Sequence, residues 1–198
     1  MIRTLGRRTA ATLKIRDSRF MACALPVESE SEARAQVASV AREHPGATHC
    51  CFAYRVLDRD VLIERCHDAG EPVGTAGAQI LTAIQGADLA NVAVTVVRYF
   101  GGTKLGLGNL ARAYRKAARA ALDAGSAEVR SIRRRIGVRL PLPIVGEARS
   151  LLAQMGGDVL SESYAEAAEL VLAIDGTREA ELRRRLDDLS RGSARWRT

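Results

Sequence analysis

Residues 91–125 read NVAVTVVRYFGGTKLGLGNLARAYRKAARAALDAG and carry the clearest structural signal in the chain. Positions 91–99 are almost wholly apolar and rich in β-branched side chains, which predicts a buried central strand. A glycine-rich turn follows, from Gly101 to Gly108. The next segment has apolar residues at helical spacing, which predicts a helix to about Ala124 that is ended by Gly125. We therefore expect this helix to pack on a sheet that contains the strand 91–99.

The residues before this segment predict further strands and helices of the same domain. Strands are expected at 12–15, 20–25, 48–57 and 61–66, the last two joined by a hairpin turn at Asp58-Arg59-Asp60. A helix is expected at 28–42, because acidic residues crowd its first turn and apolar side chains recur along it. A second helix is expected at about 75–84, with Thr75 as its N-cap.

A composition shift near residue 131 predicts a domain boundary. Arg133-Arg134-Arg135 stands between two apolar segments. Beyond it we expect a strand at 136–141, a helix at 145–155, strands at 159–164 and 170–174, and a helix at 178–189. This β-α-β-β-α order is typical of a ferredoxin-like sandwich, to which a short last strand would be added. The predicted fold class is therefore α+β, with an N-terminal βαβ domain at 1–131 and a ferredoxin-like C-terminal domain at 132–198.

Composition limits the class of protein. The chain has 198 residues, of which 47% are hydrophobic and 27% charged, so a packed core is expected and disorder is not. The formal net charge of +7 favours nucleic acid or another anionic partner. Four cysteines in a chain of this size do not indicate a disulfide framework. Neither a secretory signal nor a membrane-length apolar run is recognised, so we expect a cytoplasmic protein that does not enter membranes.

The predicted helix after the glycine turn carries charge of one sign. From Leu89 to Leu122 the sequence has no Asp or Glu, whereas Arg112, Arg115, Lys116 and Arg119 fall at i, i+3, i+4 and i+7 and share one helical face. Apolar residues on the opposite face are expected to pack on the sheet; they are Leu107, Leu110, Ala111, Tyr114, Ala117, Ala118 and Ala121. Backbone N–H groups in the glycine turn and at the helix start favour an anion beside this face.

These features predict a binding surface for phosphate groups, most simply those of a nucleic-acid backbone. The residues expected to contact phosphates are Arg98, Lys104, Arg112, Arg115, Lys116 and Arg119, with Gly101 and Gly102 allowing the backbone to come close. Because few aromatic residues are free to stack on bases, little sequence readout is expected. The plainer interpretation is a tight turn followed by a solvated basic face.

Three other kinds of site find less support in the sequence. The run 106–111 matches G-x-G-x-x-A, but five residues separate it from the strand and no acidic residue follows at dinucleotide-site spacing. Two histidines and three cysteines on neighbouring strands are of the types that bind metal ions (His49, Cys50, Cys51, Cys66 and His67). Only His49 and Cys51 would share a face, so thiols buried in the sheet are expected, with no metal and no cofactor. A hydrolase using His67, Asp68 and Glu71 lacks an evident nucleophile.

Several segments resemble the YigZ/IMPACT family. They are 14–20 (KIRDSRF), 47–55 (ATHCCFAYR), 70–77 (GEPVGTAG) and 97–106 (VRYFGGTKLG), followed by Arg112-Ala113-Tyr114. The resemblance covers most of residues 12–122, and the tail after residue 131 resembles the second domain of bacterial members. It implies a first domain similar to domain four of elongation factor G, and a second similar to domain five.

The resemblance also implies a role around translation, through RNA, ribosomes or translation-control proteins, with no assigned catalytic set. We therefore expect an RNA- or ribosome-binding regulator of translation that is not an enzyme. Two alternatives stay open: a regulator that uses the same surface against an acidic translation-control protein, and a hydrolase centred on the Gly70–Gly77 loop.

Overall fold

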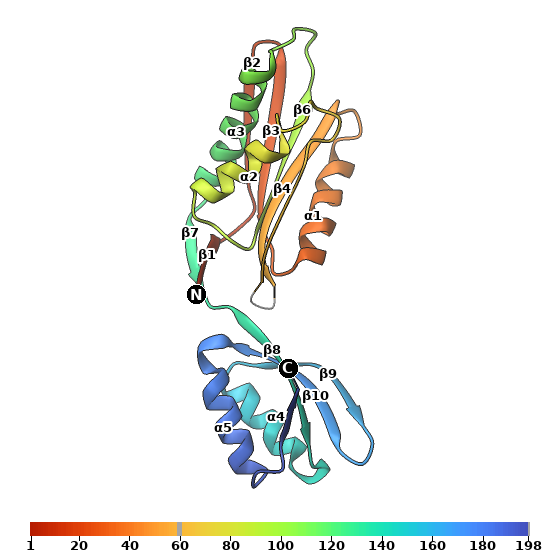
Figure 1. Ribbon diagram of the computed structural model, residues 1–198, viewed down its shortest axis with the longest axis vertical. Helices are drawn as coiled ribbons and strands as arrows, with labels where there is room; N and C mark the ends of the chain where they lie inside the picture. The colour runs from red at the N-terminus through yellow and green to blue at the C-terminus, as the bar shows by residue number, and fades with distance from the viewer. Residues whose placement is uncertain (59–60, 198) are drawn as a thin grey trace. The chain divides into compact units, whose positions relative to one another are not determined.

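A computed structural model describes residues 1–58 and 61–197, and the chain divides into two compact units (Figure 1). The first unit is Ile2–Arg130, and the second begins at Ser131. Each unit combines a β-sheet with helices and has its own hydrophobic core. The predicted two-domain α+β fold is therefore confirmed.

The first unit is built on a five-stranded antiparallel sheet. Its strand order is β2 (Thr9–Ile15), β3 (Ser18–Pro26), β6 (Val92–Tyr99), β4 (His49–Asp58) and β5 (Val61–His67). β6 is the middle strand, and all of its residues except the last are buried. The apolar run that predicted a central strand thus reflects burial on both faces of the sheet.

Helices cover both faces of this sheet. On one face α1 (Glu30–Glu43) packs over Ala93 and Val97 of β6. On the other, α2 (Gly77–Gly86) and α3 (Leu107–Asp123) pack over the alternate residues Val92, Val94 and Val96. Figure 1 shows this three-layered arrangement, with α1 alone on its side. The expected likeness to elongation factor G stays a prediction.

A two-stranded ribbon closes the first unit. β1 (Ile2–Leu5) pairs antiparallel with β7 (Ala127–Arg130), from Ile2 opposite Arg130 to Leu5 opposite Ala127. Sequence patterns did not predict either strand. β7 is exposed along its whole length, so it lacks the apolar alternation by which strands are recognised.

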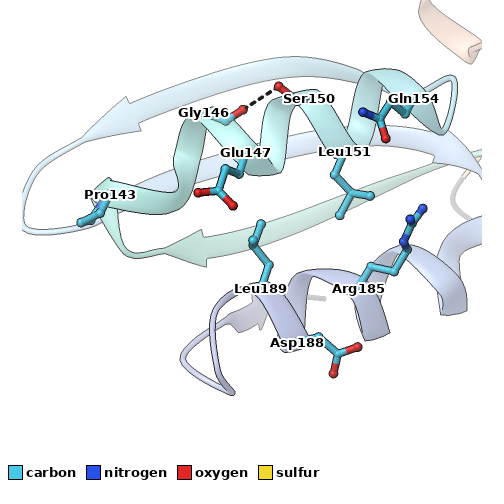
Figure 2. A pocket seen from close by; sticks show the side chains of 9 residues that line it. All are labelled: Pro143, Gly146, Glu147, Ser150, Leu151, Gln154, Arg185, Asp188 and Leu189. Atoms are coloured by element: carbon cyan, nitrogen blue, oxygen red, sulfur yellow. Dashed lines mark hydrogen bonds between the residues drawn. The ribbon is translucent and has the colours of Figure 1, made fainter.

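The second unit has the order β8 (Arg133–Leu140), α4 (Val145–Gln154), β9 (Asp158–Tyr164), β10 (Ala168–Asp175), α5 (Glu179–Leu189) and β11 (Arg195–Arg197). Its antiparallel sheet has the strand order β11-β8-β10-β9. The predicted β-α-β-β-α order is confirmed, and β11 supplies the expected last strand of a ferredoxin-like sandwich. A shallow groove between α4 and α5 is lined by Glu147, Leu151, Arg185 and Asp188, among others (Figure 2).

The start of α2 differs from the prediction. The second helix was expected to start at Thr75 with that residue as N-cap, but α2 starts at Gly77, and the Thr75 hydroxyl donates to the carbonyl of Pro72. Residues 59 and 60 of the predicted hairpin turn lie outside the described residues. Within the described part of the chain, no helix has the length and apolar character needed to cross a bilayer.

Candidate nucleic-acid interface

The outer face of α3 presents exposed cationic side chains. Arg112, Arg115, Lys116 and Arg119 are exposed, while the inner face of the helix is buried in the core. Arg112 donates to the side-chain oxygen of Asn109 at 2.7 Å, and Arg115 donates to that of Gln79 at 2.6 Å.

The charge of this face is largely uncompensated. In residues 1–58 and 61–197, Arg112, Arg115 and Lys116 form no ion pair with a carboxylate. Arg119 differs, because its Nε donates to both oxygens of Asp123, at 2.8 and 2.9 Å. The acid-free span ends at Leu122, one residue before that carboxylate. Arg112, Arg115 and Lys116 are therefore available to bind an anion, whereas Arg119 is already paired with Asp123.

Leu107 corrects the predicted orientation of the first turn of α3. It was expected on the face that packs on the sheet, but it is exposed. Leu107 is the first residue of the helix, where the chain has just left the turn, so the core does not yet cover it. The remaining residues predicted for the inner face are buried or partly buried.

The glycine turn is held by the β2–β3 hairpin. The Thr103 hydroxyl donates to Asp17 Oδ2 at 2.6 Å, and Arg16 Nη1 donates to the carbonyl of Lys104 at 3.3 Å. Gly102 and Gly106 have φ values of +97° and +79°, which side chains disfavour. Lys104 itself is exposed at the tip of this turn.

Gly101 has a different role from the one predicted. A Cβ atom at this position would collide with the backbone carbonyl of Asp17. The missing side chain therefore allows the turn to pack on the β2–β3 hairpin. At Gly102 an added Cβ would meet no atom within 4 Å, so this residue remains a place where a ligand could approach the backbone.

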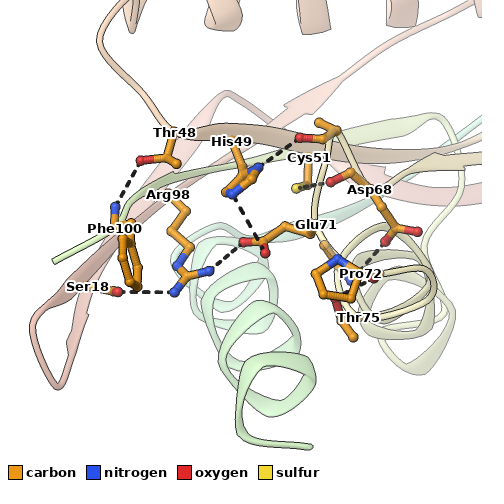
Figure 3. A network of polar contacts seen from close by, with 12 residues as sticks. Ser18, Thr48, His49, Cys51, Asp68, Glu71, Pro72, Thr75, Arg98 and Phe100 are labelled. Carbon is orange, nitrogen blue, oxygen red and sulfur yellow. Dashed lines mark hydrogen bonds and ion pairs between the residues drawn. The ribbon is translucent and has the colours of Figure 1, made fainter. Parts of the chain in front are cut away.

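Arg98 is not part of the exposed surface, which corrects its predicted role as a phosphate contact. It is 5% exposed, and its guanidinium donates from Nη1 to Glu71 Oε1 at 2.8 Å and from Nη2 to Ser18 Oγ at 3.3 Å. The same guanidinium lies over the rings of Phe20 and Phe100, 5.5 and 5.1 Å from their centroids. Figure 3 shows it beside Phe100. Its place in the central strand turns it inward, toward the side covered by α2 and α3.

Glu71 is the centre of this buried network. It is 8% exposed, and Oε1 also accepts a hydrogen bond from the Tyr114 hydroxyl at 2.7 Å. His49 Nε2 lies 3.8 Å from Oε2. Burial, with the charge and hydrogen bonds of its neighbours, raises the pKa of Tyr114 well above its usual range. Glu71 thus joins β6, α3 and its own loop from inside the fold.

Asp68 organises the same loop from its other side. Its carboxylate accepts hydrogen bonds from the backbone N–H groups of Gly74, Ala76 and Gly77, at 2.8–3.0 Å. Burial alone would raise the pKa of Asp68, but these three donors outweigh it and hold the pKa below its usual value. Asp68 therefore caps the start of α2, the role that sequence patterns assigned to Thr75.

The cysteines do not gather into a metal site. Among the described residues, no three His, Cys, Asp or Glu side chains are grouped closely enough to hold a metal ion. Cys51 is fully buried and donates to the carbonyl of Asp68 at 3.0 Å, and burial raises the pKa of its thiol to about 12. Cys66 was expected to be buried, but it lies exposed on β5, at the edge of the sheet.

The network around Glu71 was missed by sequence reasoning, although one signal pointed to it. Arg98 is the only charged residue in an otherwise apolar central strand. A charge there needs a buried partner, because an unpaired charge in the core is strongly unfavourable. A glutamate elsewhere in the chain should therefore have been sought for it.

Comparisons with known proteins agree with this architecture. The Impact N-terminal domain matches residues 16–122, and a domain of unknown function, DUF1949, matches residues 138–193. An IMPACT family member of Thermus thermophilus is 38% identical over 179 residues, which cover 90% of this chain and 96% of the relative. YigZ, an IMPACT family member of Escherichia coli, is 31% identical over 181 residues, covering 91% and 89%.

A solved structure has the same fold across both units. The crystal structure of a hypothetical protein superposes with a TM-score of 0.83 and 29% identity, and covers 98% of this chain and 95% of that one. Two units of this kind, with a glycine turn leading into a basic helix, define a two-domain α+β protein of the bacterial IMPACT type. The chain belongs to the IMPACT family.

Proposed function

We propose that this protein binds RNA, free or within the ribosome, and acts in the regulation of translation in the cytoplasm. The binding surface is the basic face formed by Lys104, Arg112, Arg115 and Lys116. The observation that carries the proposal is that Arg112, Arg115 and Lys116 lie exposed on one helix face without an ion-pair partner among the described residues.

The chemistry of this face favours a phosphate backbone. Guanidinium groups suit phosphate oxygens, because they can donate two parallel hydrogen bonds. The affinity should therefore be dominated by charge, depend strongly on salt, and vary little with RNA sequence.

Salt-dependent RNA binding tests the proposal. The wild-type chain is expected to bind RNA at low salt, with log affinity falling linearly with log salt concentration. Arg112→Ala with Arg115→Ala should reduce the magnitude of that slope by about 1.4 for single strands and about 1.8 for duplex. The matched control is Arg34→Ala with Arg42→Ala, which removes the same charge from α1 on the opposite face of the sheet.

The outcomes separate the proposal from a protein-binding role. If the wild type does not bind RNA at low salt, the proposal is wrong, and an acidic protein partner for the same face becomes the better hypothesis. If both double variants lose affinity equally, the effect comes from total charge, and the α3 face is not the binding site.

The contacts of the Gly70–Gly77 loop do not favour a hydrolase. Glu71 is committed to Arg98 and Tyr114, and Asp68 to three backbone N–H groups. Cys51 lies against the same loop, but with a pKa of about 12 it is held as a thiol at neutral pH and is a poor nucleophile. These contacts hold the loop against β6 and α3.

A further inference from the structure

Phe100 connects the buried network to the exposed glycine turn. The guanidinium of Arg98 lies over its ring, 5.1 Å from the centroid (Figure 3). The backbone N–H of Phe100 donates to the hydroxyl of Thr48 at 3.1 Å. Both contacts hold the residue in place, yet it remains 43% exposed. Because Arg98 covers one side of the ring, the exposed area lies on the rest of it.

The surroundings of this ring suit a nucleotide. The next two residues, Gly101 and Gly102, have no side chains that could shield it. Lys104 follows in the same turn, and the hydrogen bond from Arg16 to the carbonyl of Lys104 brings a second exposed cation to that turn. A fixed aromatic surface next to flexible cations is the combination with which proteins hold unpaired nucleotides, by stacking on the base and pairing with the phosphate.

We propose that Phe100 is a stacking platform for an unpaired base, so that the RNA bound at this turn is single-stranded. The proposal rests on the RNA-binding function proposed above and specifies the class of RNA. The Arg98–Glu71 pair supports the Phe100 ring in this arrangement. Arg98 lies over one face of the ring, and the base would stack on the other face. Stacking accepts any base, which agrees with an affinity that varies little with sequence.

The test compares single-stranded and duplex RNA on the full chain. Fluorescence anisotropy would measure binding of a labelled oligouridine and of a blunt RNA duplex of equal length at low salt. Phe100→Leu keeps an apolar side chain but cannot stack, so affinity for the oligouridine should fall by about fivefold or more. Phe100→Tyr should keep the wild-type affinity, and duplex affinity should be unchanged in both variants.

Tyr164→Leu is the matched control, because Tyr164 is an exposed aromatic residue in the second unit. It should leave both affinities unchanged. The inference is overturned if Phe100→Leu leaves oligouridine affinity unchanged, if it weakens oligouridine and duplex equally, or if Tyr164→Leu has the same effect. Should the wild type bind neither RNA, the proposed function itself fails, whereas the preceding outcomes leave that function intact.

A spectroscopic variant covers the case in which Phe100→Leu is unstable. Phe100→Trp keeps an aromatic ring and adds a fluorophore to a chain whose one native tryptophan is Trp196 in the second unit. Stacking of a base should quench the new indole when oligouridine binds, while the wild type, with Trp196 alone, should change little. Saturable oligouridine binding without additional quenching would contradict the proposal.

Discussion

Arg98 and Glu71 form an ion pair inside the first unit, with Nη1 and Oε1 2.8 Å apart and both side chains almost completely buried. The two residues are 27 positions apart in the sequence, in β6 and in the loop before α2. The pair joins the middle of the sheet to the loop that carries Asp68.

Removing one member of this pair should destabilise the protein strongly. Glu71→Leu leaves the Arg98 guanidinium buried without a counter-charge, and the free energy of unfolding should fall by about 3–5 kcal/mol. Chemical denaturation of the full chain, followed by circular dichroism, measures the loss. The double variant Glu71→Leu with Arg98→Met should recover part of it, because no charge is then left unpaired. Additive losses would show that the two side chains are not coupled.

The cap formed by Asp68 predicts a pH-dependent loss of stability. Asp68→Asn should lower the free energy of unfolding by about 1 kcal/mol at neutral pH, since a carboxylate that accepts three N–H groups becomes a weaker acceptor. The folded pKa of Asp68 lies below its ordinary 3.8, so the unfolded chain binds the proton more readily. The contribution is therefore present above about pH 4 and is lost as the pH falls through the folded pKa.

Thermal unfolding of wild type and Asp68→Asn over a pH series measures this contribution. The difference between the two proteins should shrink below about pH 4. Asp88→Asn is the control, because Asp88 is exposed and its ion pair with Arg3 is long, at 3.4 Å. A difference that stays constant across the acid range would argue against an ionised cap.

The two glycines at the start of the turn should tolerate alanine differently. At Gly101 the added Cβ collides with the backbone of Asp17, so Gly101→Ala should cost about 1–3 kcal/mol of unfolding free energy. At Gly102 the Cβ meets nothing, and the cost should be about 1 kcal/mol from its positive φ alone. Equal costs, measured by denaturant unfolding, would mean that the turn does not pack on the β2–β3 hairpin as described.

The thiols should react in the order set by their exposure and pKa. Cys66 is exposed, whereas Cys51 is buried with its pKa raised to about 12. Iodoacetamide at mildly alkaline pH should therefore modify Cys66 first and leave Cys51 unmodified until the protein unfolds. Mass spectrometry of digested protein reads out each site, and Cys66→Ser should remove the fast phase. Rapid modification of Cys51 in folded protein would contradict the buried network.

The ion pair between Arg119 and Asp123 should limit RNA affinity. Asp123→Asn frees the guanidinium of Arg119 and extends the basic face by one cation, so affinity at low salt should rise by about two- to fivefold. The gain should disappear in the variant that also carries Arg119→Ala. Binding titrations at low and high salt measure it, and Asp88→Asn controls for the change in total charge.

Sequence patterns predicted the backbone well where burial is regular. β6 could be recognised because both of its faces are covered, and α3 because its inner face is apolar along the helix. The ferredoxin-like order followed from similar local signals. β1 and β7 could not be found in this way, because they stabilise one another by pairing across more than a hundred residues with little apolar periodicity.

The candidate site was predicted only in part, because some of its contacts join elements that are far apart in the sequence. Periodicity placed Arg112, Arg115 and Lys116 together correctly, since residues on one helix share a face by local geometry alone. The partner of Arg98, the partner of Gly101 and the cap of α2 come from other elements. Such contacts depend on the tertiary fold, which no local pattern encodes.

The β1–β7 ribbon has a consequence for how the chain could be rearranged. Since Ile2 stands opposite Arg130, the first unit begins and ends at neighbouring positions. A short peptide could join these two ends, and new termini could be opened in an exposed turn, without breaking a strand of the five-stranded sheet. The first unit is thus suited to circular permutation, or to insertion as a whole into a loop of another protein.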